Sequence, residues 1–171
     1  GHKGVDLMKE VLEKSLYERN IQYVVLGSGE WEYENFFRYL HDKYPDKVGI
    51  TIGFVPDLAR KIYAGADLFL MPSKSEPCGL SQMVAPRYGT LPIVRETGGL
   101  KDSITDCGDG HGNGFTFKTY DAYDMLGAIY RGVDAYNSKD WKVLVKRALE
   151  CDMSWGKSAN EYIKMYRSLL K

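Results

Sequence analysis

The sequence has few cysteines, no surplus of either charge and no long run of apolar residues. Its three cysteines, Cys78, Cys107 and Cys151, are odd in number and far apart, which argues against a disulfide framework and favours a reducing compartment. Lysine and arginine total 23, as do aspartate and glutamate, so no global field favours nucleic acid or an anionic membrane surface. No apolar run approaches the ~20 residues of a membrane-spanning helix. We therefore expect neither nucleic acid nor a membrane as a partner.

Metal-binding patterns are missing as well. His2, His41 and His111 form no closely spaced pair, and the cysteines lack the spacing of zinc ligands. No D-x-D motif stands at the end of a strand-like run. We therefore predict no metal site.

What is present suits one compact domain, residues 1–171. The chain is 44% hydrophobic and 13% aromatic, which is enough for a sizeable core. Strands that are nearly all apolar and alternate with helices predict an α/β fold, with one parallel sheet covered by helices on both faces. The apolar, β-branched runs that predict strands are 21–26, 48–52, 67–71, 91–94 and 114–117. Helical patterns occupy 5–12, 31–44, 57–63 (capped by Asp57), 79–88 and the chain from 121 onward, with breaks near 137–138 and 152–154.

Ligands of an open parallel sheet bind outside the carboxyl ends of its strands. Three clusters follow strands there: Gly27–Gly29, Gly53–Phe54 and Ser73–Ser81. The first is a poor dinucleotide-binding fingerprint, because Glu32 stands where the third glycine belongs, and no G-x-x-x-x-G-K-[ST] loop is present. These absences disfavour a nicotinamide-dependent oxidoreductase and a phosphate-loop ATPase.

The segment Glu76-Pro77-Cys78-Gly79-Leu80-Ser81 carries the most specific chemistry. It places a carboxylate beside a tight turn that opens into a predicted helix, and unpaired N–H groups at such a helix start bind phosphate. A glutamate beside a phosphate site suits a nucleotide-sugar. The alternative is an ordinary strand–turn–helix crossover in which Pro77 and Gly79 serve only the turn.

Three segments give the chain a resemblance to a known family. They are Pro72-Ser73-Lys74-Ser75-Glu76-Pro77-Cys78-Gly79-Leu80-Ser81-Gln82, then Tyr88–Leu100 with its Thr97-Gly98-Gly99-Leu100, and the opening His2-Lys3-Gly4-Val5-Asp6-Leu7. Together with Gly114–Phe117 and Ser154-Trp155, they resemble the second domain of bacterial glycogen synthases and plant starch synthases, glycosyltransferase family 5. The resemblance spans essentially the whole chain.

The resemblance implies the nucleotide-sugar half of a GT-B fold, in which two Rossmann-like domains face each other across a cleft. The implied reaction transfers glucose from ADP-glucose to an α-1,4-glucan with retention of configuration and without a metal or other cofactor. Glu76 would contact the glucose and stabilise positive charge at its anomeric carbon, as the catalytic residue. The implied donor-binding residues are Lys3 (pyrophosphate), Gly53 and Phe54 (adenine), Cys78 and Gly79 (pocket lining), and Leu80 and Ser81 (phosphate-binding N–H groups).

Some features depart from the family pattern. The family's pyrophosphate-binding arginine would precede Gly1, and the first domain is missing, so we expect a fragment of a longer enzyme that is inactive alone. Val84 stands where related retaining enzymes carry a second glutamate, which favours the glycogen and starch synthases. The C-terminal helix, 161–170, is expected to cross to the missing domain in the parent and to dock only partly in the fragment.

Several alternatives stay open. The chain could use a different nucleotide-sugar, UDP-glucose included, or be a stand-alone module that binds ADP or glucan without catalysis. The aromatic residues of its helices could form a glucan-binding patch. A phosphorolytic GT-B enzyme would hold pyridoxal phosphate on a lysine, for which no motif is present. A bacterial cytoplasmic location is expected, with the plastid as the alternative.

Overall fold

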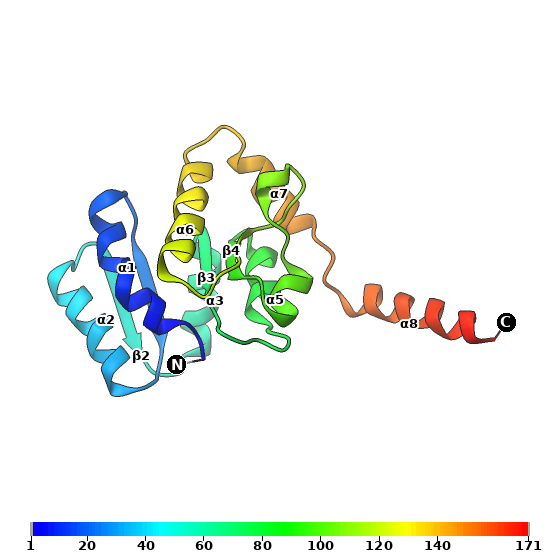
Figure 1. Ribbon diagram of the computed structural model, residues 1–171, viewed down its shortest axis with the longest axis horizontal. Coiled ribbons are helices and arrows are strands. Elements are labelled where there is room, and N and C mark those ends of the chain that lie inside the picture. The colour runs from blue at the N-terminus through cyan, green and yellow to red at the C-terminus, as the bar shows by residue number, and fades with distance from the viewer. Residues whose placement is uncertain (1, 171) are drawn as a thin grey trace.

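The computed structural model describes residues 2–170, apart from the side chain of Asp109, and confirms the α/β fold class. Figure 1 shows helices packed around short strands, with one helix extending away at the C-terminus. All five predicted strands are present within a residue or two of their expected bounds: β1 (Tyr23–Gly27), β2 (Val48–Ile52), β3 (Leu68–Met71), β4 (Leu91–Arg95) and β5 (Phe115–Phe117). The main helices are α1 (Val5–Glu18), α2 (Trp31–Lys43), α3 (Pro56–Gly65), α6 (Ala122–Tyr136), α7 (Trp141–Glu150) and α8 (Trp155–Leu169).

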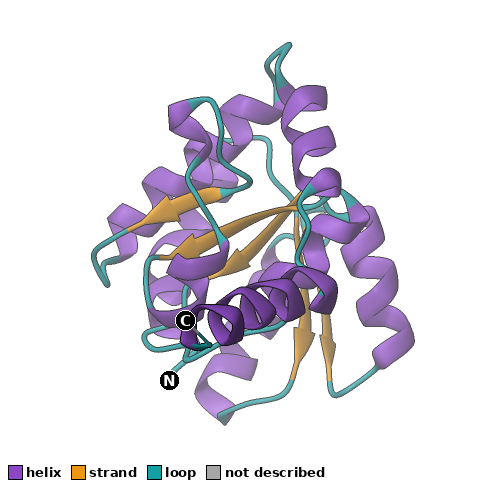
Figure 2. Ribbon diagram, turned by 90° about the vertical axis from the view of Figure 1, so that its right-hand side faces the viewer, coloured by secondary structure: helices purple, strands orange, loops and turns teal. Residues whose placement is uncertain are grey.

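The strands are all parallel but form two sheets rather than the one sheet expected. β1 pairs with β2, and β3, β4 and β5 form the second sheet in that order. Within the described chain no ladder joins β1 to β3, and in Figure 2 the strands of the two sheets run in different directions. Apolar runs predict that strands exist, but they carry no information on which strands pair.

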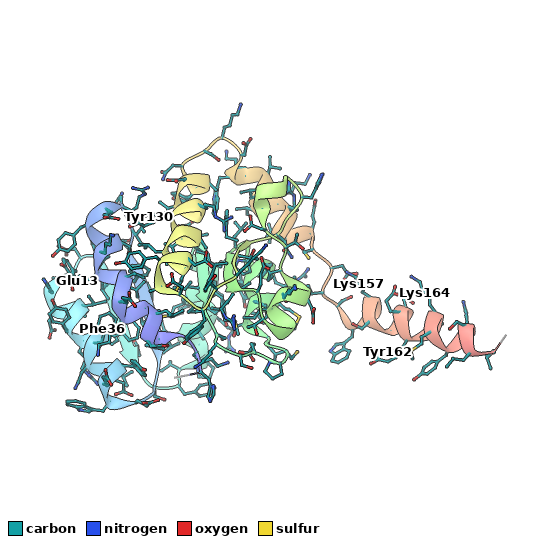
Figure 3. All side chains as sticks on the ribbon, viewed as in Figure 1. Glu13, Phe36, Tyr130, Lys157, Tyr162 and Lys164 are labelled. Atoms are coloured by element: carbon teal, nitrogen blue, oxygen red, sulfur yellow. The ribbon has the colours of Figure 1, made fainter. Side chains whose placement is uncertain are left out.

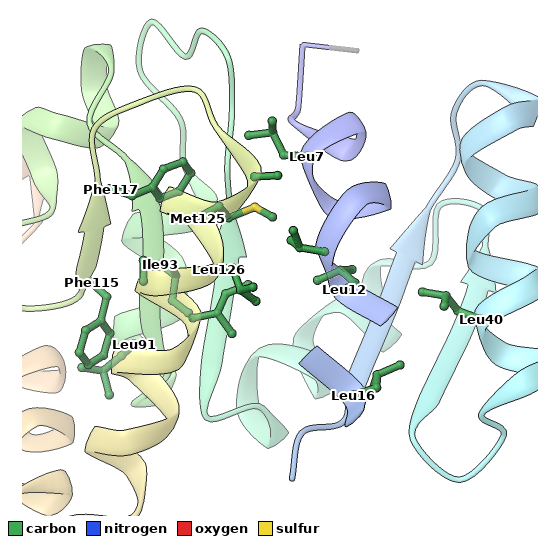
Figure 4. Packing of buried hydrophobic residues seen from close by; sticks show 14 of the residues in the cluster. Leu7, Leu12, Leu16, Leu40, Leu91, Ile93, Phe115, Phe117, Met125 and Leu126 are labelled. Carbon is green, nitrogen blue, oxygen red and sulfur yellow. The ribbon is translucent and has the colours of Figure 1, made fainter. Parts of the chain in front are cut away.

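The core joins the two sheets through α1 and α6. Leu12 on α1 and Met125 on α6 are fully or almost fully buried in one cluster with Ile93 of β4 and Leu40 of α2. Figure 4 shows α1 between the two groups of strands, with its leucines facing inward. This packing follows from the helical spacing of the leucines in α1, which places them on one face.

Two predicted helix details are wrong. Asp57 does not cap α3: Val55 occupies the N-cap position, Pro56 begins the helix and Asp57 pairs with Arg60 inside the first turn. Proline favours the first helical position because its missing N–H has no helical partner to lose. The helix expected over 79–88 is a single α turn, α4 (Ser81–Val84), followed by a 3-10 turn, η1 (Ala85–Tyr88), because Pro86 cannot continue the α-helical hydrogen bonding. A short helix that the sequence pattern does not predict, α5 (Gly98–Ser103), follows β4.

The C-terminal helix α8 has no buried residue. It extends away from the body, and its aromatic side chains are exposed, Trp155 among them. Tyr162 is labelled on this helix in Figure 3. None of its side chains is buried within the described part of the chain, and the expected contact with another domain stays a prediction. Among the described residues, no helix is long and apolar enough to cross a membrane.

Asp106 fastens the loop before β5 to the rest of the fold. Its carboxylate accepts hydrogen bonds from the Arg131 guanidinium at 2.8 Å and from the backbone N–H of Thr116 at 2.7 Å and Gly108 at 2.8 Å. Burial raises the pKa of Asp106, but these hydrogen bonds and the positive charge of Arg131 outweigh it and lower the pKa below its usual value.

Asp106→Asn should therefore destabilise the protein at neutral pH, by about 1–2 kcal/mol for the weakened hydrogen bonds to a charged group. A carboxyl whose pKa is lowered by folding contributes stability above its unfolded pKa and loses it as pH falls through the folded pKa. The difference between wild type and variant should thus be full above about pH 4 and shrink below it. Urea unfolding at pH 7 and pH 3 measures this, and an equal difference at both values would contradict it.

Candidate nucleotide-sugar site

The N-terminal segment lies against the loop that follows β3. The backbone N–H of Lys74 donates to the carbonyl of His2 at 2.9 Å. Gly4 has a positive φ of 73°, and a Cβ at this position would lie 2.1 Å from the carbonyl oxygen of Pro72. Only glycine permits this approach, which brings Lys3 beside the loop.

Lys3 and Glu76, separated by 73 positions in the sequence, form an ion pair. The Glu76 side chain is only 11% exposed whereas that of Lys3 is 66% exposed, so the carboxylate lies at the base of the site and the ammonium at its rim. The Ser73 hydroxyl lies 3.4 Å from the same carboxylate and donates to it. The structure thus brings together the two charged residues that the resemblance selected.

Arg95, at the carboxyl end of β4, holds the loop in place. Its guanidinium donates to the carbonyl of Ser73 at 3.1 Å and of Lys74 at 2.6 Å. The Lys74 ammonium and the Arg95 guanidinium each lie 5.5 Å from the centre of the Tyr120 ring. Burial and a hydrogen bond to Asp6 raise the pKa of Tyr120 to about 12, so the phenol stays protonated. Sequence reasoning missed Arg95 as a site residue, although a charged residue closing a buried strand was a usable signal.

The turn after Glu76 is packed backbone to backbone against the start of α5. The Gly99 N–H donates to the carbonyls of Glu76 at 3.1 Å and Pro77 at 3.2 Å. A Cβ on Gly98 would lie 2.2 Å from the Glu76 carbonyl oxygen, and one on Gly99 would lie 2.2 Å from that of Cys78. The two longest segments of the family resemblance are therefore adjacent in space, and their glycines permit the contact.

Leu80 and Ser81 begin the short helix as expected. The Leu80 carbonyl accepts the N–H groups of Met83 at 2.9 Å and Val84 at 3.0 Å. Among the described residues, the N–H groups of Leu80 and Ser81 donate to no protein acceptor. Cys78 is exposed and its thiol is free, with only a weak contact to the Gly79 carbonyl at 3.5 Å. The turn that follows Glu76 in the chain thus carries backbone N–H donors without a protein acceptor among the described residues.

Gly53 and Phe54 lie at the carboxyl end of the other sheet. The Gly53 N–H donates to the Gly27 carbonyl at 2.9 Å, and its φ of 138° lies in a region that favours glycine. Phe54 is 91% exposed, and Trp31 at the start of α2 is 79% exposed. Among the described residues no hydrogen bond or ring contact joins Phe54 to the Glu76 loop, so the expected adenine-binding role of this ring stays a prediction.

Two surface hollows, of about 620 Å³ and 450 Å³, are lined by residues other than those around Glu76: the first lies on the outer face of α2 and the second beside Cys151 and Arg147. Among residues 2–170, no group of three or more histidine, cysteine, aspartate or glutamate side chains is arranged to hold a metal ion. The arrangement offers one carboxylate, one ammonium and free N–H donors, which suits a ligand with anionic and sugar-like parts.

Comparison with known proteins agrees with this chemistry. A family model described as "Glycosyl transferases group 1" matches residues 1–164. A glycogen synthase of Bacillus cereus is 49% identical over 99% of this chain, and one of Anoxybacillus flavithermus is 50% identical over 98%. The catalytic domain of starch synthase IV from Arabidopsis thaliana, bound to ADP and acarbose, superimposes with a TM-score of 0.85 and 36% identity over 99% of the chain. The chain spans only 35–36% of the length of these three proteins.

Proposed function

The chain belongs to the group 1 glycosyl transferases, and we propose that it is the ADP-glucose-binding half of a retaining glucosyltransferase that elongates α-1,4-glucan. Residues 1–171 would form the C-terminal domain of a two-domain GT-B enzyme. The coverage of 36% of the Bacillus cereus glycogen synthase supports a larger parent. The ADP and acarbose bound to the Arabidopsis structure support the donor and the glucan acceptor.

The observation that carries the proposal is the Lys3–Glu76 pair, followed four and five residues later in the chain by the N–H groups of Leu80 and Ser81, which have no protein acceptor among the described residues. In the proposed complex the donor pyrophosphate binds the Lys3 ammonium and these N–H groups, which offset the charge that develops on the departing ADP. Glu76 then faces the glucose, and its carboxylate stabilises positive charge at the anomeric carbon. The exposed Phe54 ring packs against adenine once the donor bridges the two sheets.

The isolated chain should not transfer glucose, because the facing domain supplies the acceptor site and the remaining donor contacts. Proximity and orientation account for several orders of magnitude in rate, and half of a cleft does not supply them. We propose a bacterial cytoplasmic location for the parent, which the Bacillus and Anoxybacillus relatives support. Two rival functions remain: transfer from a different nucleotide-sugar, and nucleotide binding without catalysis.

Calorimetric titration of the chain with ADP and UDP tests the proposal. We expect ADP to bind more tightly than UDP, and Lys3→Ala to weaken ADP binding roughly tenfold, the value of one charge-assisted hydrogen bond to phosphate. Lys9→Ala is the matched control, because Lys9 also forms an exposed ion pair, with Glu32 between α1 and α2. Tighter binding of UDP would favour a different nucleotide-sugar, and equal losses in both variants would contradict a specific phosphate contact.

A further inference from the structure

Gln82, in the single turn of α4, is fully buried and holds the loop that precedes it. Its side-chain amide Nε2 donates to the carbonyl of Cys78 at 3.0 Å and to that of Gly79 at 3.1 Å. It also lies 3.3 Å from the Ser103 hydroxyl, which donates to the Gly99 carbonyl at 2.5 Å. One side chain thus links the turn at Cys78–Gly79 to α5.

The side-chain oxygen of Gln82, Oε1, indicates that this residue does more than fill space in the core. Its Oε1 is buried and has no hydrogen-bond partner among the described residues. It faces Gly79, where a Cβ would lie 2.5 Å from it. An unpaired buried oxygen costs stability, and an apolar side chain of the same length would fill the space without that cost. The stabilising contribution of Gln82 therefore comes from the hydrogen bonds that Nε2 donates to the Cys78 and Gly79 carbonyls.

The hydrogen bonds from Gln82 Nε2 to these two carbonyls also fix the direction of the neighbouring backbone N–H groups. In a planar trans peptide the carbonyl of one residue and the N–H of the next point in opposite directions. Because the Cys78 and Gly79 carbonyls both point inward to Gln82, the N–H groups of Gly79 and Leu80 point away from the protein interior. Neither N–H donates to a protein acceptor within residues 2–170.

We infer that Gln82 is the positioning residue of the donor-binding turn, which it fixes so that the Gly79 and Leu80 N–H groups face the donor phosphates. The inference rests on the proposed function for its ligand. It also adds Gly79 N–H to the phosphate-binding groups, where the sequence assigned Gly79 only to the lining of the pocket.

Gln82→Met tests this inference, because methionine keeps the length of the side chain but donates no hydrogen bond. We expect ADP affinity of the chain to fall about tenfold, as when one or two phosphate contacts are misdirected. Amide hydrogen exchange at Gly79 and Leu80 should become faster, because the turn opens more often. Thr90→Val is the matched control: Thr90 is equally buried and donates to the carbonyls of Tyr63 at 2.5 Å and Ala66 at 2.8 Å.

Thr90→Val should lower the melting temperature as Gln82→Met does but leave ADP affinity and exchange at the turn unchanged. Equal ADP affinity and equal exchange rates in the two variants would overturn the inference. If wild type bound no nucleotide, the proposed function and the ligand assignment would fail, whereas the exchange rates would still decide whether Gln82 holds the turn. Should Gln82→Met not fold, Ser103→Ala keeps the amide but removes its link to α5, and a smaller change in the same direction is expected.

Discussion

Glu76→Gln should lower glucosyl transfer by about 10²–10³-fold, the effect of removing one preorganised electrostatic contact to the charge that develops in a transition state. The Glu76 carboxylate is nearly buried, so its charge acts on a bound sugar with little screening by water. Glutamine keeps the shape and the hydrogen bond from Ser73 but removes the charge. ADP affinity should stay equal or rise slightly, because Lys3 loses its carboxylate partner and is free for phosphate.

Transfer can be measured in a chimera in which this chain replaces the matching 36% of the Bacillus cereus glycogen synthase. The loss should appear in kcat, with KM for ADP-glucose little changed. Glu32→Gln is the control, because Glu32 also pairs with a lysine but its side chain is 63% exposed and forms no hydrogen bond or ion pair with the Glu76 loop among the described residues. A chimera that elongates glucan equally well with Glu76→Gln would exclude Glu76 from catalysis, and a parallel fall in ADP affinity would point to donor binding instead.

Gly99→Ala should destabilise the protein strongly, with a loss of about 3 kcal/mol or more in the free energy of unfolding. The added Cβ would lie 2.2 Å from the Cys78 carbonyl oxygen, and the atoms it meets all belong to the Cys78 backbone, so no flexible side chain can move aside. The start of α5 and the turn at 76–78 would have to separate, which breaks the hydrogen bonds from Gly99 N–H to Glu76 and Pro77. ADP binding should be lost together with this packing.

Gly127→Ala is the control for this change. Gly127 lies in α6 with no atom within 4 Å of an added Cβ, so alanine there should stabilise the protein by about 0.5–1 kcal/mol through helix propensity. Urea unfolding of both variants, followed by ADP titration, measures the contrast. Stability and ADP binding close to wild type in Gly99→Ala would show that the contact between the two motif segments is not required.

Local pattern was sufficient for most of the elements. Runs such as Val48–Ile52 and the amphipathic stretch of α2 are recognisable because strand and helix periodicity are properties of neighbouring residues. The errors were local too: Asp57 resembled a helix cap, but Pro56 had already begun the helix. The pattern after Gly79 predicts a longer helix than the structure has, because Pro86 ends α-helical hydrogen bonding after one turn.

For the candidate site, the sequence identifies the residues of the long motif but not the residues that support them. Motif resemblance selected Lys3, Glu76, Leu80 and Ser81 without any coordinates, because the order and spacing of a long motif are properties of the sequence. It gave no role to Arg95 or Gln82, whose partners are backbone carbonyls brought near them by the fold. Hydrogen bonds to backbone atoms leave little trace in residue type, so such supporting residues are hard to recognise from sequence.

By itself, the sequence determined the α/β class, the position of the strands and the residue types that make this chain similar to glycogen and starch synthases. Only the tertiary structure decided that Lys3 meets Glu76, that Gly99 packs on the turn at Cys78 and that the strands divide into two sheets. The physical reason is the separation along the chain between the residues that interact. Periodicity and turn chemistry act between residues a few positions apart, whereas these contacts join segments separated by 20 or more residues and form only when the whole core packs.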